Sequence, residues 1–215
     1  MSENQDNKTT PLKQLHEKKE YAKSELADDF PVVALSSSEG IYIVTSAKAV
    51  NHDKVDLLVN ADGVNIVFAG RGNQTDLSIL KTALEHWVSQ FIIQVSTFDL
   101  AGQLVSSSAA EILRNHFLNR AKALSVQVII ADPMAPDYPF WATNFDGATI
   151  LGKNFTLSEA GIQEIKRNFG SMEEMRAFAH EFLKKYKGTR QFYQLKFKTK
   201  PRSKKDSANS KKTTR

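Results

Sequence analysis

The fold of this chain is decided by residues 32–44, whose sequence is VVALSSSEGIYIV. Two apolar stretches, Val32 to Leu35 and Ile41 to Val44, flank a run of serines that ends before Gly40. Short runs of β-branched and apolar residues separated by turn-forming residues are typical of two strands joined by a hairpin. The sequence therefore predicts an antiparallel strand pair at this point.

A second strand pair follows. Val55 to Asn60 and Val64 to Ala69 flank Ala61-Asp62-Gly63, and an Asp-Gly pair readily adopts the positive φ angles of a tight turn. Three further strands are expected over residues 126–131, 140–144 and 149–151, and a last one over residues 192–197, where apolar side chains alternate.

Five helices are predicted where apolar residues recur every three or four positions behind a capping residue. They are expected over residues 12–27, 76–91, 108–124, 158–169 and 171–186. Asp76 is the expected cap of the second helix, while Ser108 with Glu111 and Ser171 with Glu174 form capping boxes. Gly170 and Gly188 are expected to end the last two helices.

The order is thus helix, four strands, two helices, three strands, two helices and strand. Runs of strands followed by runs of helices favour an antiparallel α+β architecture over βαβ alternation. We expect two stacked sheets with a helix pair covering each outer face.

Composition limits the class of protein. The chain has 215 residues, 41% of them apolar and 25% charged, and it has no cysteine, which excludes disulfides and thiolate chemistry. It has no run of about 18 apolar residues that would span a bilayer. The net charge of +5 arises in the tail, because residues 196–215 hold nine Lys or Arg and one Asp, leaving 20 basic and 23 acidic residues in the body.

Several features resemble the bacterial 20S proteasome α-type subunits. In that family a helix rich in charged residues and Ala runs straight into a Val-Val-Ala-Leu strand, as residues 20–35 do here. The family then has a Gly turn, a strand, a Lys, two strands around a Gly, and a small residue followed by Gly. The matching residues here are Gly40, residues 41–44, Lys54, Gly63 and Ala69-Gly70.

The resemblance implies a four-layer αββα sandwich of the N-terminal-nucleophile hydrolase type. It also implies that Lys54, Gly70 and Arg71 form a pocket for the C-terminal carboxylate of an activator. An ammonium group is a compact charge suited to a carboxylate. In catalytic β subunits the nucleophile is an N-terminal Thr, whereas Phe30 and Pro31 stand at that position here, and Ser46 replaces the family's Asp.

We therefore expect a non-catalytic subunit with no catalytic residue, no metal and no cofactor. Residues 1–10 would form a disordered gate-like segment, residues 11–198 the folded domain, and residues 199–215 a disordered basic tail. The expected partners are seven copies of the chain in a ring, proteasome β subunits, an AAA+ ATPase activator and protein substrates, in the cytoplasm. Neither a membrane nor a nucleic acid is expected as a partner.

Two alternatives stay open at this stage. A diverged hydrolase of the same fold would cleave itself and expose Ser36, Ser37 or Ser38 as a nucleophile. An adaptor would bind nucleic acid through the basic tail by releasing counterions, although no aromatic residue after Phe197 offers a stacking surface. The five histidines show no spacing typical of a metal site.

Overall fold

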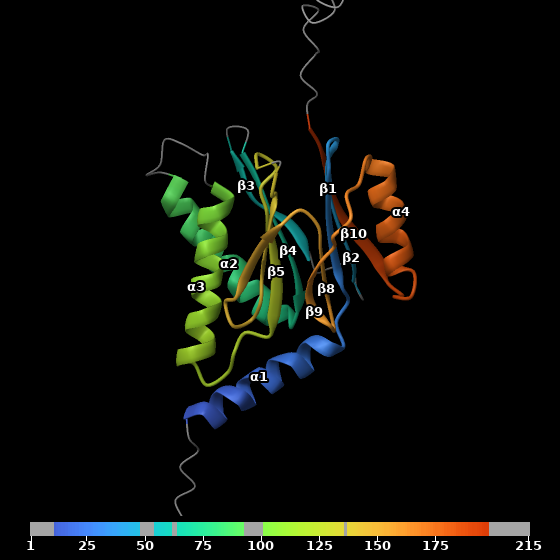
Figure 1. Cartoon of the computed structure of the whole chain (residues 1–215). Coiled ribbons are helices and arrows are strands. Elements are labelled where there is room, and N and C mark those ends of the chain that lie inside the picture. Colours follow the sequence, from blue (N-terminus) through green and yellow to red (C-terminus); the bar gives the residue numbers. More distant parts are fainter. Residues whose placement is uncertain (1–10, 48–53, 62–63, 93–100, 136, 198–215) are drawn as a thin grey trace, which may run out of the picture.

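A computed structural model describes residues 11–47, 54–61, 64–92, 101–135 and 137–197 of the chain (Figure 1). The helices in this part are α1 (Pro11–Ala27), α2 (Gln74–Ile92), α3 (Ala101–Asn119) and α4 (Met172–Leu183). The strands are β1 (Val32–Ser37), β2 (Gly40–Ala47), β3 (Val55–Ala61), β4 (Val64–Gly72), β5 (Val126–Ala131), β6 (Phe140–Thr143), β7 (Thr149–Gly152), β8 (Phe155–Ser158), β9 (Gly161–Glu164) and β10 (Thr189–Lys196).

The strands form two five-stranded antiparallel sheets. The strand order is β10-β2-β1-β8-β9 in one sheet and β3-β4-β5-β6-β7 in the other. Both predicted hairpins are confirmed: Leu35 lies opposite Tyr42 in the first, and Val55 lies opposite Ala69 in the second. The Asp62-Gly63 turn falls outside the described residues. The chain is therefore an α+β protein, as predicted.

Both faces of β1 are covered, which explains the unbroken apolar run of its first four residues, Val32 to Leu35. Successive side chains of a strand point to opposite faces. Val32 and Ala34 accordingly join a cluster with residues of β4, β5 and β6 from the other sheet. Val33 and Leu35 instead pack against α4, where Met175 is fully buried.

Helices α2 and α3 pack side by side on the β3-β4-β5-β6-β7 sheet, and α4 lies beside the sheet that contains β1 (Figure 1). Leu80 and Leu84 of α2 and Leu113 of α3 have no exposed surface. They share a buried cluster with Phe68 and Ile130, which belong to the face of β4 and β5 that points away from the β1 sheet. The predicted pair of long helices is confirmed in this position.

The helix predicted over residues 158–169 is wrong. The first part of this range belongs to the hairpin of β8 and β9, and β8 pairs with β1. Phe155 and Leu157 alternate into the cluster between the sheets, and Gly161 has a φ of 93°, which suits a tight turn. Among the described residues, α4 is consequently the only helix that covers the β1 sheet, instead of the expected pair.

Four helix ends also test the sequence. Ser171 caps α4 as predicted, because its hydroxyl accepts from the Glu174 amide at 3.2 Å. Helix α2 is capped by Asn73, not by Asp76: the Asn73 side chain accepts from the Thr75 amide at 3.0 Å. Helix α3 begins at Ala101, seven residues before the predicted Ser108, and α4 ends at Leu183, before the predicted Gly188.

Candidate carboxylate-binding site

The structure brings Lys54, Gly70 and Arg71 together at one end of the β3-β4 hairpin. Lys54 immediately precedes β3, and its carbonyl oxygen accepts from the Gly70 amide at 2.9 Å. This bond extends the antiparallel register in which Val55 faces Ala69. The Lys54 amide donates to the side chain of Gln191 on β10 at 2.9 Å, so the site lies where strands of both sheets meet.

Asp29 completes this site, although sequence reasoning gave it no role. It lies in the connection between α1 and β1. One carboxylate oxygen binds the Lys54 ammonium, and the other accepts from the Gly72 amide at 2.6 Å. The Lys54 side chain is 8% exposed and that of Asp29 is 17% exposed. Lys54 therefore already holds a carboxylate, in a largely buried ion pair.

The Arg71 guanidinium, which is fully buried, fastens α1 to this site. It donates to the carbonyl oxygens of Leu26 and Asp29, the second at 3.1 Å, and to the Gln127 side chain at 3.3 Å. Burial lowers the pKa of Arg71, and the negative charge of Asp29 opposes that effect. An arginine with three acceptors stays charged, and the carboxylate that binds Lys54 also offsets part of this buried charge.

Gly72 allows this close approach. Its φ is 121°, and a Cβ atom there would lie 2.1 Å from the Ser125 carbonyl oxygen and 3.0 Å from a methyl carbon of Leu26. The position therefore accepts only glycine without a shift of the backbone. With any other residue, the Gly72 amide could not stay within reach of Asp29 while α1 packs over it.

The leading end of β1 is occupied by the connection from α1. The chain passes from α1 through residues 28–31 into the strand, so Pro31 has an ordinary peptide nitrogen and no free amine. The Phe30 ring packs edge-on against Tyr186, with centroids 6.4 Å apart, and the Pro31 carbonyl accepts from the Thr45 hydroxyl at 2.8 Å. Ser46 is fully buried.

Two residues of the serine run, Ser36 and Ser37, make contacts that hold the first hairpin. Ser36 is the last buried residue of β1; its hydroxyl donates to the Lys153 carbonyl at 2.9 Å, and its amide donates to Asn154. The Ser37 hydroxyl accepts from the Glu39 amide at 3.2 Å. Cleavage before any of them would cut a strand or turn that the first hairpin needs, so these contacts do not favour a self-processing serine.

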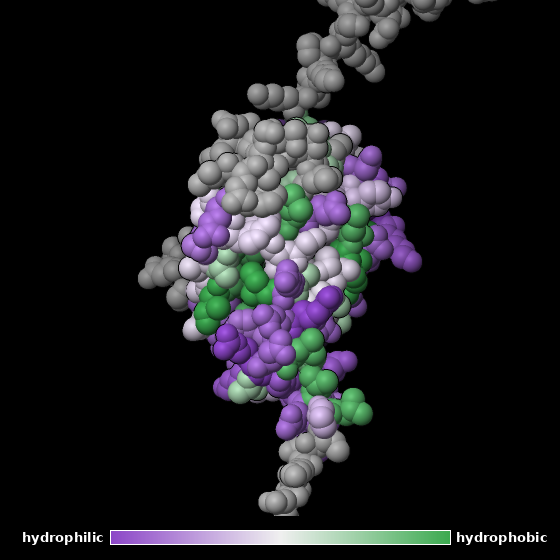
Figure 2. Space-filling model, turned by 90° about the vertical axis from the view of Figure 1, so that its left-hand side faces the viewer, coloured by the Kyte–Doolittle hydropathy of each residue, from purple (hydrophilic) through white to green (hydrophobic). Residues whose placement is uncertain are grey.

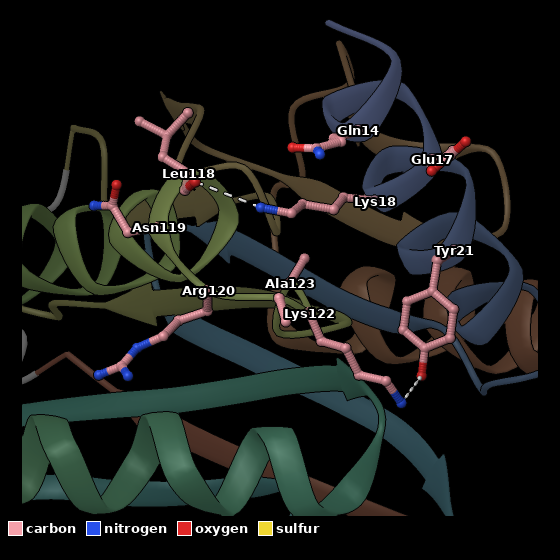
Figure 3. A pocket seen from close by; sticks show the side chains of 10 residues that line it. Gln14, Glu17, Lys18, Tyr21, Leu118, Asn119, Arg120, Lys122 and Ala123 are labelled. Carbon is pink, nitrogen blue, oxygen red and sulfur yellow. Dashed lines mark hydrogen bonds between the residues drawn. The ribbon is translucent and has the colours of Figure 1, made fainter. Parts of the chain in front are cut away.

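A separate hollow of about 640 Å³ lies between α1 and the end of α3, and the sequence did not predict it (Figure 3). Lys18 of α1 reaches across it and donates to the carbonyl oxygens of Phe117 and Leu118 at 3.1 and 3.4 Å. Lys122 donates to the Tyr21 hydroxyl at 3.4 Å, and its ammonium lies 5.0 Å from the centre of that ring. These contacts steady the middle of α1.

Within the described residues, no helix is long and apolar enough to cross a bilayer, and no three His, Asp or Glu side chains gather as metal ligands would. A comparison with models of known protein families finds no match, and a comparison with curated proteins finds no matching sequence either.

Proposed function

We propose that this chain is a non-catalytic α-type subunit of a bacterial 20S proteasome. Seven copies would form an outer ring that stacks on a ring of catalytic β subunits, admits protein substrates and docks an AAA+ ATPase in the cytoplasm. The fold proposed for each copy is the αββα sandwich of that family, with α4 alone in place of the second helix pair.

One observation supports the proposal most. By the resemblance, the threonine of a catalytic relative would stand at Phe30-Pro31, and here Arg71 donates to the carbonyl oxygens of Leu26 and Asp29 just before this connection. While α1 stays joined to the leading end of β1, no free amine is generated there to act as a base. The same contacts fix the position of α1, through which a non-catalytic subunit would contact the next copy in the ring.

Helix α1 is suited to a contact between copies. Among its residues only Ala22 and Leu26 are buried, whereas Leu12, on the same helical stripe, is 80% exposed. Figure 2, viewed from the side of α2 and α3, shows hydrophilic side chains gathered toward α1 with apolar atoms beside them. A contact of this head-to-tail type closes into a ring when the rotation between copies permits.

The test is assembly. The chain is expressed alone and with a β-type subunit from the same genome, and native mass spectrometry is used to look for species at seven times 24.1 kDa and at the mass of the two-ring particle. Leu12→Glu is expected to abolish these species. Phe192→Glu, at a side chain that is 62% exposed on β10, serves as the matched control. A chain that stays monomeric with every β partner contradicts the proposal.

A further inference from the structure

The Lys54 site already contains what a docking partner would bring. A terminal carboxylate has two oxygen atoms that need donors, and the site has two donors, the Lys54 ammonium and the Gly72 amide. The side chain of Asp29 engages both donors, one with each oxygen. An outside carboxylate and the Asp29 carboxylate therefore compete for the same two groups.

We propose that Asp29 is an internal occupant of the Lys54 site, which an incoming chain-terminal carboxylate must displace before a partner can dock. The inference rests on the proposed function in that it takes this site as the docking position. It adds that the site is closed by the chain itself in the free subunit.

Exchange of one carboxylate for another is the substitution that the site tolerates. Lys54 is largely buried, and a buried ammonium without a counter-charge is strongly destabilising. Arg71 adds a second positive charge close by. A neutral group in place of Asp29 would leave both cations short of negative charge, whereas a terminal carboxylate restores the original balance.

Displacement of Asp29 is also transmitted to α1. Asp29 lies two residues beyond the end of α1; its amide donates to the Leu26 carbonyl at 3.3 Å, and Arg71 holds the carbonyl oxygens of both residues. When the Asp29 side chain leaves the site, this connection has to turn, and the last turn of α1 loses part of its attachment. Occupancy of the site and the position of α1 are therefore coupled, and the coupling acts in both directions.

The experiment removes the internal carboxylate and supplies one from solution. Asp29→Ala and wild type are melted in sodium acetate and in sodium chloride of equal ionic strength. Acetate is expected to raise the melting temperature of Asp29→Ala and to leave wild type unchanged. The double variant Asp29→Ala with Lys54→Met is expected to lose this response, because the ammonium that binds acetate is gone.

A second measurement uses a peptide of eight residues with either a free C-terminal carboxylate or a C-terminal amide. The acid form is expected to bind Asp29→Ala about tenfold more tightly than wild type, equivalent to about 1.4 kcal/mol, because it no longer competes with the Asp29 carboxylate, and the amide form is expected to bind neither. Hydrogen exchange in residues 11–27 is expected to quicken when the acid form binds wild type.

Equal responses of Asp29→Ala and wild type to acetate, or no response in either, would overturn the inference. If Asp29→Ala does not fold, Asp29→Asn takes its place, since its amide oxygen still accepts from Gly72; failure of both to fold would show that Asp29 is an irreplaceable part of the structure and not an occupant. Ring assembly of wild type is scored separately. Rings without an acetate response reject this inference alone, and an acetate response without rings rejects the proposed function.

Discussion

The Lys18 ammonium of α1 donates to the Phe117 carbonyl oxygen at 3.1 Å, across 99 positions of sequence. The last carbonyl groups of a helix have no partner within it and carry partial negative charge, so a cation there stabilises the helix end. This one side chain therefore joins the N-terminal helix to the end of α3.

Replacement of Lys18 by Met is expected to lower the free energy of unfolding by about 1 kcal/mol, the usual value of such a bond. Lys19→Met, at an exposed side chain one position along the same helix, is the matched control and is expected to change little. Urea unfolding of both variants measures the difference. Equal effects of the two changes would mean that the contact with Phe117 contributes nothing.

Arg71→Met is expected to cost about 3 kcal/mol or more, because it removes the arginine donor from the Asp29 and Gln127 oxygens, removes one of the two donors of the Leu26 oxygen, and takes a cation away from Asp29. Arg71→Lys is expected to recover little of this loss, since one ammonium cannot reach acceptors spread around a planar guanidinium. The two variants are compared by thermal melting. A fully stable Arg71→Lys protein would contradict this account of the site.

A comparison of two glycines with positive φ distinguishes the cost of backbone strain from the cost of a steric clash by an added Cβ atom. Gly72→Ala places a Cβ atom 2.1 Å from a carbonyl oxygen, while Gly161→Ala, at φ 93°, meets nothing within 4 Å. We expect the Gly161 change to cost about 1 kcal/mol from the unfavourable φ alone, and the Gly72 change to cost clearly more and to loosen α1. Chemical denaturation and hydrogen exchange in residues 11–27 measure the two effects.

Burial raises the pKa of Asp132 above its ordinary value of 3.8, although the Met134 and Gly102 amides both donate to it and oppose the shift. A carboxyl group with a raised pKa in the folded state binds more protons there than in the unfolded chain. Its contribution to stability therefore increases as pH falls through the folded-state pKa toward 3.8. The unfolding free energy of wild type minus that of Asp132→Asn should therefore increase as the pH is lowered over this range. A difference that stays flat or decreases as the pH is lowered contradicts the assignment.

The strands were predictable where local pattern and tertiary environment agree. The β1-β2 and β3-β4 hairpins, β5 and the Ser171 cap all follow from turn residues, apolar runs and capping chemistry close to them in sequence. The hairpin of β8 and β9 was missed because its strands have four residues each, and because Ile162, Ile165 and Phe169 happen to have helical spacing. Only pairing with β1 decides between the two structures.

The misplaced helix starts have a common cause in distant partners. Asp132, 30 positions away in sequence, accepts from the Gly102 amide at the start of α3, and no local sequence pattern contains that contact. Asp76 has the chemistry of a cap but accepts from the Ser125 amide at 2.8 Å instead. For the candidate site, the resemblance pointed to Lys54, Gly70 and Arg71. It did not point to Asp29, because the contact of Asp29 with Lys54 depends on how α1 packs against the rest of the chain.

Strand β10 pairs along its whole length with β2, from Thr189 opposite Ala47 to Lys196 opposite Gly40. During synthesis on a ribosome, the edge of β2 and the cluster it shares with β4 and β5 stay uncovered until the segment ending at residue 196 has left the exit tunnel. The β3-β4-β5-β6-β7 sheet needs nothing beyond Gly152. The nascent protein should therefore fold in two stages, through a partly folded, aggregation-prone intermediate. Only rapid completion of folding or a chaperone would protect this intermediate.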